Sequence, residues 1–395
     1  MRAGVERVGV VGAGTMGAGI AQIAALAGYE TRLHDPAPAA LETGIERMRT
    51  ALAKGAAKGL WSEPEAEEAS ARAGAAASLD ELGECDLVVE AAPEELGLKR
   101  RLFAALARTC GPETILATNT SSLPVTAIGE GAPHPERVVG MHFFNPPALM
   151  KLVEVVATED SSAAALDATT EVGRRMGRTP IRAKDSPGFI ANRLARPFSL
   201  ESLRMLAEGV ADAETIDRVV RVGGGFRMGP FELIDLIGVD VNLSVARSFY
   251  HQGGEPERWQ PSPIQERMVG EGRLGRKSGR GFYEYGDGRR RQPDSNLGIE
   301  APTLDPGELE RIDPAAASIL PRLFAQIANE AAFALEEEIG SPEDMDTAMR
   351  LGFNWPRGPL ELTGLIGRTR AASLLDELRA RHGDAYAPAP LLTRG

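Results

Sequence analysis

A histidine and a glutamate lie in two neighbouring apolar runs of the chain, where the pattern calls for core residues. His142 lies in RVVGMHFFN and Glu154 in KLVEVV, and Asn-Pro-Pro at 145–147 separates the two runs. Proline interrupts regular structure, so the runs are predicted to be adjacent strands joined by a turn. A buried carboxylate is costly unless it is paired. Beside an imidazole it orients one ring nitrogen and leaves the other as a base, so the pair predicts general acid–base chemistry.

A glycine pattern near the start of the chain predicts a dinucleotide site. The pattern G-x-G-x-x-G follows an apolar strand directly and opens a helix, which gives a tight turn, close approach of a pyrophosphate and helix amides facing the phosphates. The predicted cofactor-binding turn consists of Gly12, Gly14, Thr15, Met16 and Gly17. Asp35 ends the next apolar run, where a carboxylate accepts hydrogen bonds from a ribose and repels a 2′-phosphate. The predicted cofactor is therefore NAD rather than NADP.

Polar side chains follow two further predicted strands. Glu94 and Lys99 come after the strand that ends at Glu90, and Ser121 follows the strand 114–118 within Asn-Thr-Ser-Ser. Ligands of a doubly wound sheet gather at the carboxyl ends of its strands, so these side chains are candidates for cofactor or substrate contacts. Two alternatives stay open: a solvated helix face for the charged pair, and helix capping for the serines.

The elements that position these residues alternate along the first part of the chain. Short apolar runs alternate with helix-length stretches, which predicts a Rossmann-type, doubly wound and largely parallel α/β sheet. The apolar runs are 8–12, 31–34, 87–90, 114–118, 138–144, 152–156 and 179–183. After Pro187-Gly188 a long helix is predicted to start at Phe189, with Asn192 near its N-terminus, and helical patterns continue to the end of the chain.

The helical part contains an internal repeat. Residues 201–238 and 330–367 align without a gap at an offset of 129, with Asp217 falling on Asp346. Duplication of a helical unit is favoured over chance similarity, because two copies bury a face that one copy exposes. The sequence thus predicts a sheet domain followed by two tandem all-α domains. The expected divisions are 1–185 for the NAD-binding domain, 186–285 for the first helical domain, 286–310 for a polar linker and 311–395 for the second helical domain.

Composition limits the partners and the compartment. The 395 residues carry a formal charge of −12, which argues against nucleic acid as the main partner. No apolar run reaches the length of a membrane span, and no cleavable signal precedes the first strand, so no membrane association is expected. Two cysteines are too few for a disulfide framework, and their spacing is not that of metal ligands. A cytoplasmic protein without a metal site is expected.

Several motifs together resemble the L-3-hydroxyacyl-CoA dehydrogenase family, which includes 3-hydroxybutyryl-CoA dehydrogenases. They occur in family order over nearly the whole chain: GAGTMGAGIA, VVEAAPEELGLKRRLF, NTSSLP, HFFNPPALMKLVEVV, DSPGFIANR and GRKSGRGFYEY. The resemblance implies NAD-dependent oxidation of an L-3-hydroxyacyl-CoA to a 3-ketoacyl-CoA, with His142 as catalytic base and Glu154 as its partner. It also implies that Ser121 and Asn192 contact the reacting substrate. The cofactor contacts that it implies are Asp35, Glu94, Lys99, Ser121, Asn145 and Lys277.

The chain departs from the common short form of that family in two respects. It continues beyond GFYEY with the second helical copy, as in long bacterial members, so a homodimer and a contact made by the repeat within one chain are both open. In the helix expected to meet CoA, the lysine register differs, and either Lys54 or Lys58 could hold the CoA phosphates. Two other functions remain as alternatives. One is an NAD-dependent dehydrogenase of a CoA-free hydroxy acid or sugar acid, and the other is a non-catalytic NAD-binding relative.

Overall fold

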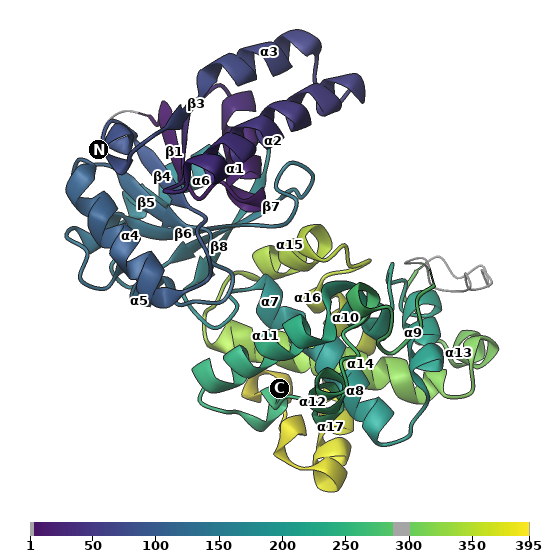
Figure 1. Ribbon diagram of the computed structural model, residues 1–395. Coiled ribbons are helices and arrows are strands. Elements are labelled where there is room, and N and C mark those ends of the chain that lie inside the picture. Colours follow the sequence, from purple (N-terminus) through teal and green to yellow (C-terminus); the bar gives the residue numbers. More distant parts are fainter. Residues whose placement is uncertain (1–3, 287–300, 395) are drawn as a thin grey trace. The chain divides into compact units, whose positions relative to one another are not determined.

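The computed structural model describes residues 4–286 and 301–394. The chain divides into two compact units, Met1–Phe189 and Ile190–Gly395, and both copies of the helical repeat belong to the second (Figure 1). Among the described residues, no helix has the length and apolar composition that crossing a bilayer requires.

The first unit is built on one eight-stranded sheet of the described residues, with the order β3-β2-β1-β4-β5-β6-β7-β8. All neighbouring strands are parallel except β6 and β7, which are antiparallel. The strands are β1 (Arg7–Val11), β2 (Glu30–His34), β3 (Ala73–Ala76), β4 (Leu87–Glu90), β5 (Ile115–Thr118), β6 (Val138–Phe143), β7 (Leu152–Ala157) and β8 (Thr179–Lys184). The doubly wound sheet is confirmed, and each of the predicted apolar runs lies on a strand.

Helices cover both faces of this sheet. Val8 and Val10 point to one face and join a core with α1, α2, α3 and α6, whereas α4 and α5 lie together on the other side (Figure 1). The helical segments are α1 (Thr15–Leu26), α2 (Pro38–Ala57), α3 (Glu63–Arg72), η1 (Leu79–Leu82), α4 (Leu96–Thr109), α5 (Val125–Gly129), η2 (Pro135–Arg137) and α6 (Ala163–Arg175). This arrangement brings the carboxyl ends of β1, β4, β5 and β6 to one edge of the sheet.

The second unit is helical. Its first helical copy consists of α7 (Ala191–Leu194), α8 (Arg196–Ala207), α9 (Ala213–Val222), α10 (Pro230–Ile237), α11 (Val239–Gln252), η3 (Glu257–Trp259), α12 (Pro263–Gly270) and η4 (Arg276–Ser278). The remainder consists of α13 (Pro306–Ile312), α14 (Ala316–Glu336), α15 (Pro342–Gly352), α16 (Pro359–Ile366), α17 (Arg368–His382), η5 (Asp384–Tyr386) and α18 (Pro390–Thr393).

Two predictions about the helical part of the chain need correction. Phe189 does not start a long helix, because it has a left-handed backbone with a φ of 52°. The helix that follows is interrupted between α7 and α8, since Pro197 has no N–H to continue the hydrogen-bond ladder. Part of the predicted linker is the helix α13, which Asp305 caps by accepting a hydrogen bond from the Glu308 amide at 2.9 Å. Residues 287–300 of that linker lie outside the described residues.

The repeat seen in the sequence reappears as matching helices and matching caps. The helices α15, α16 and α17 start at the offset of 129 residues from α9, α10 and α11. Asp217 Oδ1 accepts from the Phe231 amide at 2.9 Å, and Asp346 Oδ1 accepts from the Leu360 amide at 2.8 Å. A Cβ on Gly229 would lie 2.3 Å from Asp217 Cγ, and its counterpart in the second copy is equally crowded. Each Gly-Pro pair is therefore required by the aspartate that caps its helix.

Buried arginines join the two copies reciprocally. Arg193 of the first copy donates from Nε to Glu330 Oε1 at 2.8 Å and binds Glu337 with both Nη atoms, at 2.6 and 2.9 Å. Its side chain is fully buried. Trp259 Nε1 also donates to Glu330, at 2.9 Å. All charges of this cluster are therefore paired across the boundary between the copies.

Arg322 lies at the offset of 129 from Arg193 and forms the corresponding cluster with glutamates of the first copy. Its Nε donates to Glu201, and its two Nη atoms bind Glu208 at 2.6 and 2.8 Å. Tyr386 donates to Glu201 at 3.1 Å, in the role that a tryptophan has in the first cluster. Burial alone would lower the pKa of Arg322, but the two carboxylates outweigh it and raise that pKa. Each copy thus supplies an arginine to the other copy's pair of glutamates.

Candidate active site

The antiparallel register of β6 and β7 brings the two predicted acid–base residues face to face. His142 lies opposite Glu154 in the ladder, and His142 Nδ1 is 2.7 Å from Glu154 Oε2. Glu154 is fully buried and His142 is 5% exposed. The turn between the strands follows from the prolines after Asn145, which end β6 and let the chain return as β7.

This contact assigns the roles of the two imidazole nitrogens. An ionised carboxylate can only accept, so Nδ1 carries the hydrogen and donates it to Glu154. Nε2 has no hydrogen-bond partner among the described residues, which leaves it as the basic nitrogen. The rings of Phe144 and Phe189 lie 4.6 and 5.8 Å from the imidazole, between ring centroids, and give it an apolar border.

Asn119 fixes the end of the histidine's strand and was not among the predicted site residues. Its side-chain Oδ1 accepts from the Phe143 backbone amide at 2.8 Å, and its backbone amide donates to the Glu90 carbonyl at 2.7 Å. The ladder between β5 and β6 ends at Thr118 and Gly140. The Asn119 side chain therefore continues the pairing where the strands diverge, next to His142.

The glycine turn has the shape that a dinucleotide requires. Gly12 has a φ of +100°, and a Cβ there would lie 2.6 Å from the Ala91 carbonyl oxygen. A Cβ on Gly17 would lie 1.7 Å from the Gly12 oxygen, so this position must also be glycine. Gly14 is exposed and has no atom within 4 Å of its would-be Cβ, which leaves open space beside the backbone. The first turn of α1, which begins at Thr15, contains no acidic residue to oppose its positive end.

Asp35 is held against this turn. Its Oδ2 accepts from the Ala13 amide at 2.9 Å and its Oδ1 from the Ala37 amide at 3.0 Å. The carboxylate thus has a fixed orientation beside the glycine turn and keeps lone pairs for further donors. The turn and the carboxylate together fit an adenosine dinucleotide without a 2′-phosphate.

Lys99 is buried beneath the site instead of forming a solvated helix face. It is 1% exposed, and its Nζ donates to Glu90 Oε1 at 2.7 Å and to the Ala92 carbonyl at 3.2 Å. Its Nζ also lies 3.3 Å from Glu94 Oε2. Because three protein acceptors surround this ammonium group, Lys99 acts on the site through Glu90 and Glu94. Glu90, fully buried at the end of β4, is a second residue missing from the predicted site.

Glu94 organises the turn that carries Ser121. Its Oε1 accepts from Thr120 Oγ1 at 2.6 Å, from the Ser121 amide at 3.0 Å, and from the Ser122 amide and hydroxyl at 3.1 and 2.9 Å. Burial would raise the pKa of Glu94, but the Thr120 hydrogen bond, the Lys99 charge and the serine donors lower it on balance. Ser121 itself is exposed after the end of β5, and Glu94 fixes the backbone that carries its side chain.

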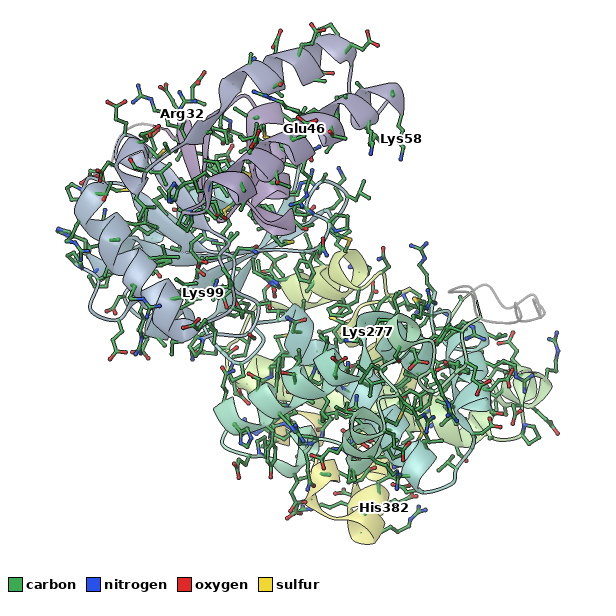
Figure 2. The ribbon with its side chains drawn as sticks, in the orientation of Figure 1. Arg32, Glu46, Lys58, Lys99, Lys277 and His382 are labelled. Carbon is green, nitrogen blue, oxygen red and sulfur yellow. The ribbon has the colours of Figure 1, made fainter. Side chains whose placement is uncertain are left out.

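The two candidate lysines border one pocket at the outer end of α2. A cavity of about 290 Å³ is lined by Lys54 and Lys58, by the start of α1, and by the apolar side chains of Leu60, Trp61 and Leu149. Lys54 also lines a neighbouring cavity of about 1080 Å³ that includes Asp35. Figure 2 shows Lys58 at the end of α2. Both lysines are exposed, so both ammonium groups can reach an anion in the smaller pocket.

The remaining predicted residues are one that follows β6 and two in the second unit. Asn145 is exposed directly after β6, and its peptide bond to Pro146 is cis. Asn192 lies in the second unit on α7, and its carbonyl accepts from Arg196 Nε at 3.2 Å. Lys277, labelled in Figure 2, forms an ion pair with Asp240 and is also in the second unit. The first unit by itself thus assembles the acid–base pair, the glycine turn and the serine turn at one sheet edge.

A glycine turn and a histidine–carboxylate pair at the carboxyl edge of a parallel sheet define a class of protein, the dinucleotide-dependent dehydrogenases. Within that class, the chain belongs to the 3-hydroxyacyl-CoA dehydrogenase family. The model of that family's NAD-binding domain matches residues 7–186, and the model of its C-terminal domain matches 188–285 and again 319–394.

Relatives of two lengths match this chain. The 3-hydroxyadipyl-CoA dehydrogenase of Escherichia coli is 36% identical, and the match covers 99% of this chain and 98% of that protein. A crystal structure of 3-hydroxybutyryl-CoA dehydrogenase from E. coli superimposes with a TM-score of 0.89 at 35% identity, covering 99% and 98% of the two chains. The probable 3-hydroxybutyryl-CoA dehydrogenase of Bacillus subtilis is 42% identical but covers 71% of this chain, with 98% of its own length matched. The second helical copy therefore has counterparts in some members of the family and not in others.

Proposed function

We propose that this protein is an NAD-dependent L-3-hydroxyacyl-CoA dehydrogenase, which oxidises the C3 hydroxyl of its substrate to a ketone and catalyses the reverse reduction. The observation that carries this proposal is the buried His142–Glu154 pair at 2.7 Å, at the same sheet edge as the glycine turn, in a member of this family. The alternative of a non-catalytic relative is disfavoured, because a structural protein has no need of an unpaired basic nitrogen beside a buried carboxylate.

In this mechanism the protein moves one proton. His142 Nε2 accepts the proton of the substrate hydroxyl, and Glu154 stabilises the imidazolium cation that results. Bound NAD supplies the hydride acceptor. Ser121, held by Glu94, donates a hydrogen bond to the reacting oxygen and orients the substrate for the histidine. In the reverse direction His142 returns the proton as a general acid.

The cofactor would be held by the residues already described. The amides of the Gly12–Gly17 turn and the first turn of α1 would face the pyrophosphate, and Asp35 would accept from the ribose hydroxyls. Glu94 and Lys99 would shape the strand ends beside it, and Asn145 and Lys277 are further proposed contacts. Asp35 would repel a 2′-phosphate, which makes NADP the weaker cofactor.

The CoA part of the substrate is proposed to use the pocket at the end of α2. Lys54 and Lys58 would pair with CoA phosphates, and Trp61 and Leu149 would cover apolar parts of the molecule. For the acyl part, the relative matched over its full length is named for a carboxylated substrate, 3-hydroxyadipyl-CoA. We therefore propose a dicarboxylic 3-hydroxyacyl group as the preferred substrate, with Asn192 among its contacts.

The protein is proposed to act in the cytoplasm as a monomer. Reciprocal clusters around Arg193 and Arg322 pair one helical copy with the other. In a short-form relative the corresponding face would have to be covered by a second subunit, whereas the second copy covers it here. The cytoplasmic assignment rests on the two buried thiols, Cys85 and Cys110, which form no disulfide.

The test uses NADH absorbance with acetoacetyl-CoA and with free hydroxy acids or keto acids. Turnover with the CoA ester and none with the free acids is expected, and the opposite result would favour a CoA-free dehydrogenase. Substitution His142→Gln should lower kcat by about 10²–10⁴-fold, which is the usual contribution of a general base, while the Kd of NAD stays within about twofold. Retention of more than a third of the wild-type kcat would remove His142 from the mechanism.

A further inference from the structure

One buried guanidinium group in the second unit has no counter-ion among the described residues. Arg196, at the start of α8, is 6% exposed. Its Nη1 is buried without a hydrogen-bond partner in the described part of the chain. Its Nε donates to the Asn192 carbonyl at 3.2 Å, and the guanidinium carbon lies 5.2 Å from the centre of the Phe249 ring. The cation is therefore held in place by a carbonyl and an aromatic ring, with donors left over.

The two other buried arginines in the described part of this unit are paired with carboxylates. Arg193 and Arg322 each bind two glutamates. Burial lowers the pKa of Arg196 to about 10, and no charge on a described residue offsets this effect. An unpaired buried charge is destabilising, so a fold that keeps one has a use for it that outweighs the cost.

The helical scaffold does not need an arginine at this position. The second copy has Ala325 at the offset of 129 from Arg196, and this alanine is fully buried in α14. The same copy has Pro321 where the first has Asn192. The arginine and the proposed substrate residue are thus both present in the first copy and both absent from the second. This pairing points to a ligand rather than to packing.

We propose that Arg196 is the specificity-determining residue that binds the terminal carboxylate of a dicarboxylic 3-hydroxyacyl group. This inference rests on the proposed function. The other anionic groups of the two substrates already have candidate receptors, since the glycine turn faces the NAD pyrophosphate and Lys54 and Lys58 face the CoA phosphates. Among the described residues of the second unit, Arg196 is the buried arginine without a carboxylate partner, and a guanidinium binds a carboxylate through strong charged hydrogen bonds.

Arg196 lies beside the proposed substrate residue Asn192. It follows Asn192 by four residues, across the interruption between α7 and α8. Its Nε contact with the Asn192 carbonyl shows that the guanidinium folds back toward Asn192. A substrate that contacts Asn192 would therefore have this cation next to it.

The experiment compares two six-carbon substrates that differ only at the end of the acyl chain. With the full-length enzyme and NAD, kcat/KM is measured for 3-hydroxyadipyl-CoA and for 3-hydroxyhexanoyl-CoA, whose chain ends in a methyl group. Wild type should prefer the diacid by at least about tenfold, and Arg196→Met should lower kcat/KM for the diacid by about 10–100-fold, as expected for loss of charged hydrogen bonds. The same variant should leave hexanoyl turnover within about threefold. Arg247→Met, which removes an exposed arginine of the same unit, should change neither substrate.

Two results would overturn the assignment while leaving the dehydrogenase activity in place. One is equal kcat/KM for both substrates in wild type, a comparison that needs no variant and therefore decides the matter even if Arg196→Met fails to fold. The other is an equal loss for both substrates in Arg196→Met, which would make the residue structural. Absence of NADH formation from both six-carbon substrates would also overturn this inference, and it would refute the proposed function only if acetoacetyl-CoA is not turned over either.

Discussion

Replacing Glu154 by glutamine removes the negative charge of the side chain and keeps its shape nearly unchanged. Glutamine has nearly the same volume and can still accept a hydrogen bond from His142 Nδ1, so the 2.7 Å contact can be kept. What disappears is the attraction between the carboxylate and the imidazolium that forms when the hydroxyl proton is taken up. For charge centres about 4 Å apart at an effective dielectric constant near 20, that attraction is about 4 kcal/mol. It corresponds to about 10³-fold in rate, and the hydrogen bond that glutamine keeps makes 10²–10³-fold the expected loss.

The assay is steady-state NADH formation at saturating NAD, with the Kd of NAD measured separately by fluorescence. Glu154→Gln should reduce kcat by about 10²–10³-fold, change KM little, and leave Tm within a few degrees, because the strand pairing is unchanged. Glu159→Gln is the matched control, since Glu159 is an exposed glutamate shortly after the same strand. A kcat for Glu154→Gln within threefold of wild type would refute the idea that a buried charge stabilises the imidazolium. A large loss of NAD affinity would show that the substitution disturbs the fold instead.

Three further predictions test other parts of the structure. Asp35→Asn removes the negative charge beside the ribose site, so the ratio of kcat/KM for NADP to that for NAD should rise at least about tenfold; an unchanged ratio contradicts the assignment. Arg193→Met leaves the buried Glu330 with only the partly exposed Arg258 as a cation and should lower the urea-measured unfolding free energy by about 3 kcal/mol or more, against less than about 1 kcal/mol for the exposed Arg247→Met. Glu94 has a lowered pKa in the folded protein, so its stabilising effect is complete above the ordinary value of 4.5 and is lost as pH falls through the lower folded pKa. The stability difference between wild type and Glu94→Gln should therefore be constant from pH 7 to about 5 and shrink only at more acidic pH; a difference that shrinks near neutral pH contradicts this.

The acid–base pair could be predicted because its signal is local. Two apolar runs separated by Asn-Pro-Pro imply adjacent strands, and a titratable group in each run implies that the two groups meet. The antiparallel register, which was not predicted, places His142 opposite Glu154. The glycine turn is also recognised from local spacing, because its glycines all lie within one strand–turn–helix unit. Only Gly17 is required by a contact inside that unit, whereas Gly12 is required by the distant carbonyl of Ala91. The fold class follows from the alternation of such units.

Features that depend on contacts between distant segments were not predictable. The strand β3 consists of Ala-Gly-Ala-Ala, which lacks the β-branched residues that mark a strand, and it forms because the edge of β2 offers a parallel ladder. The burial of Lys99 was not predictable either, since a lysine on a helix is usually solvated. Here the buried Glu90 at the end of β4 binds the Lys99 ammonium group. A buried lysine of this kind is found by looking for the cation that pairs with a buried carboxylate.

The differences between the two helical copies distinguish residues that support the fold from the residues proposed to bind the substrate. The second copy keeps what packing requires, including the capping Asp346 and the arginine and glutamates of the reciprocal clusters. It has Pro321 and Ala325 at the positions of Asn192 and Arg196. A copy retained for catalysis would have kept the latter pair, because proline removes an amide donor and alanine removes a charge that costs stability unless it is used. The second copy therefore acts as a built-in packing partner, which leaves the first copy free to keep a buried cation that the scaffold itself does not need.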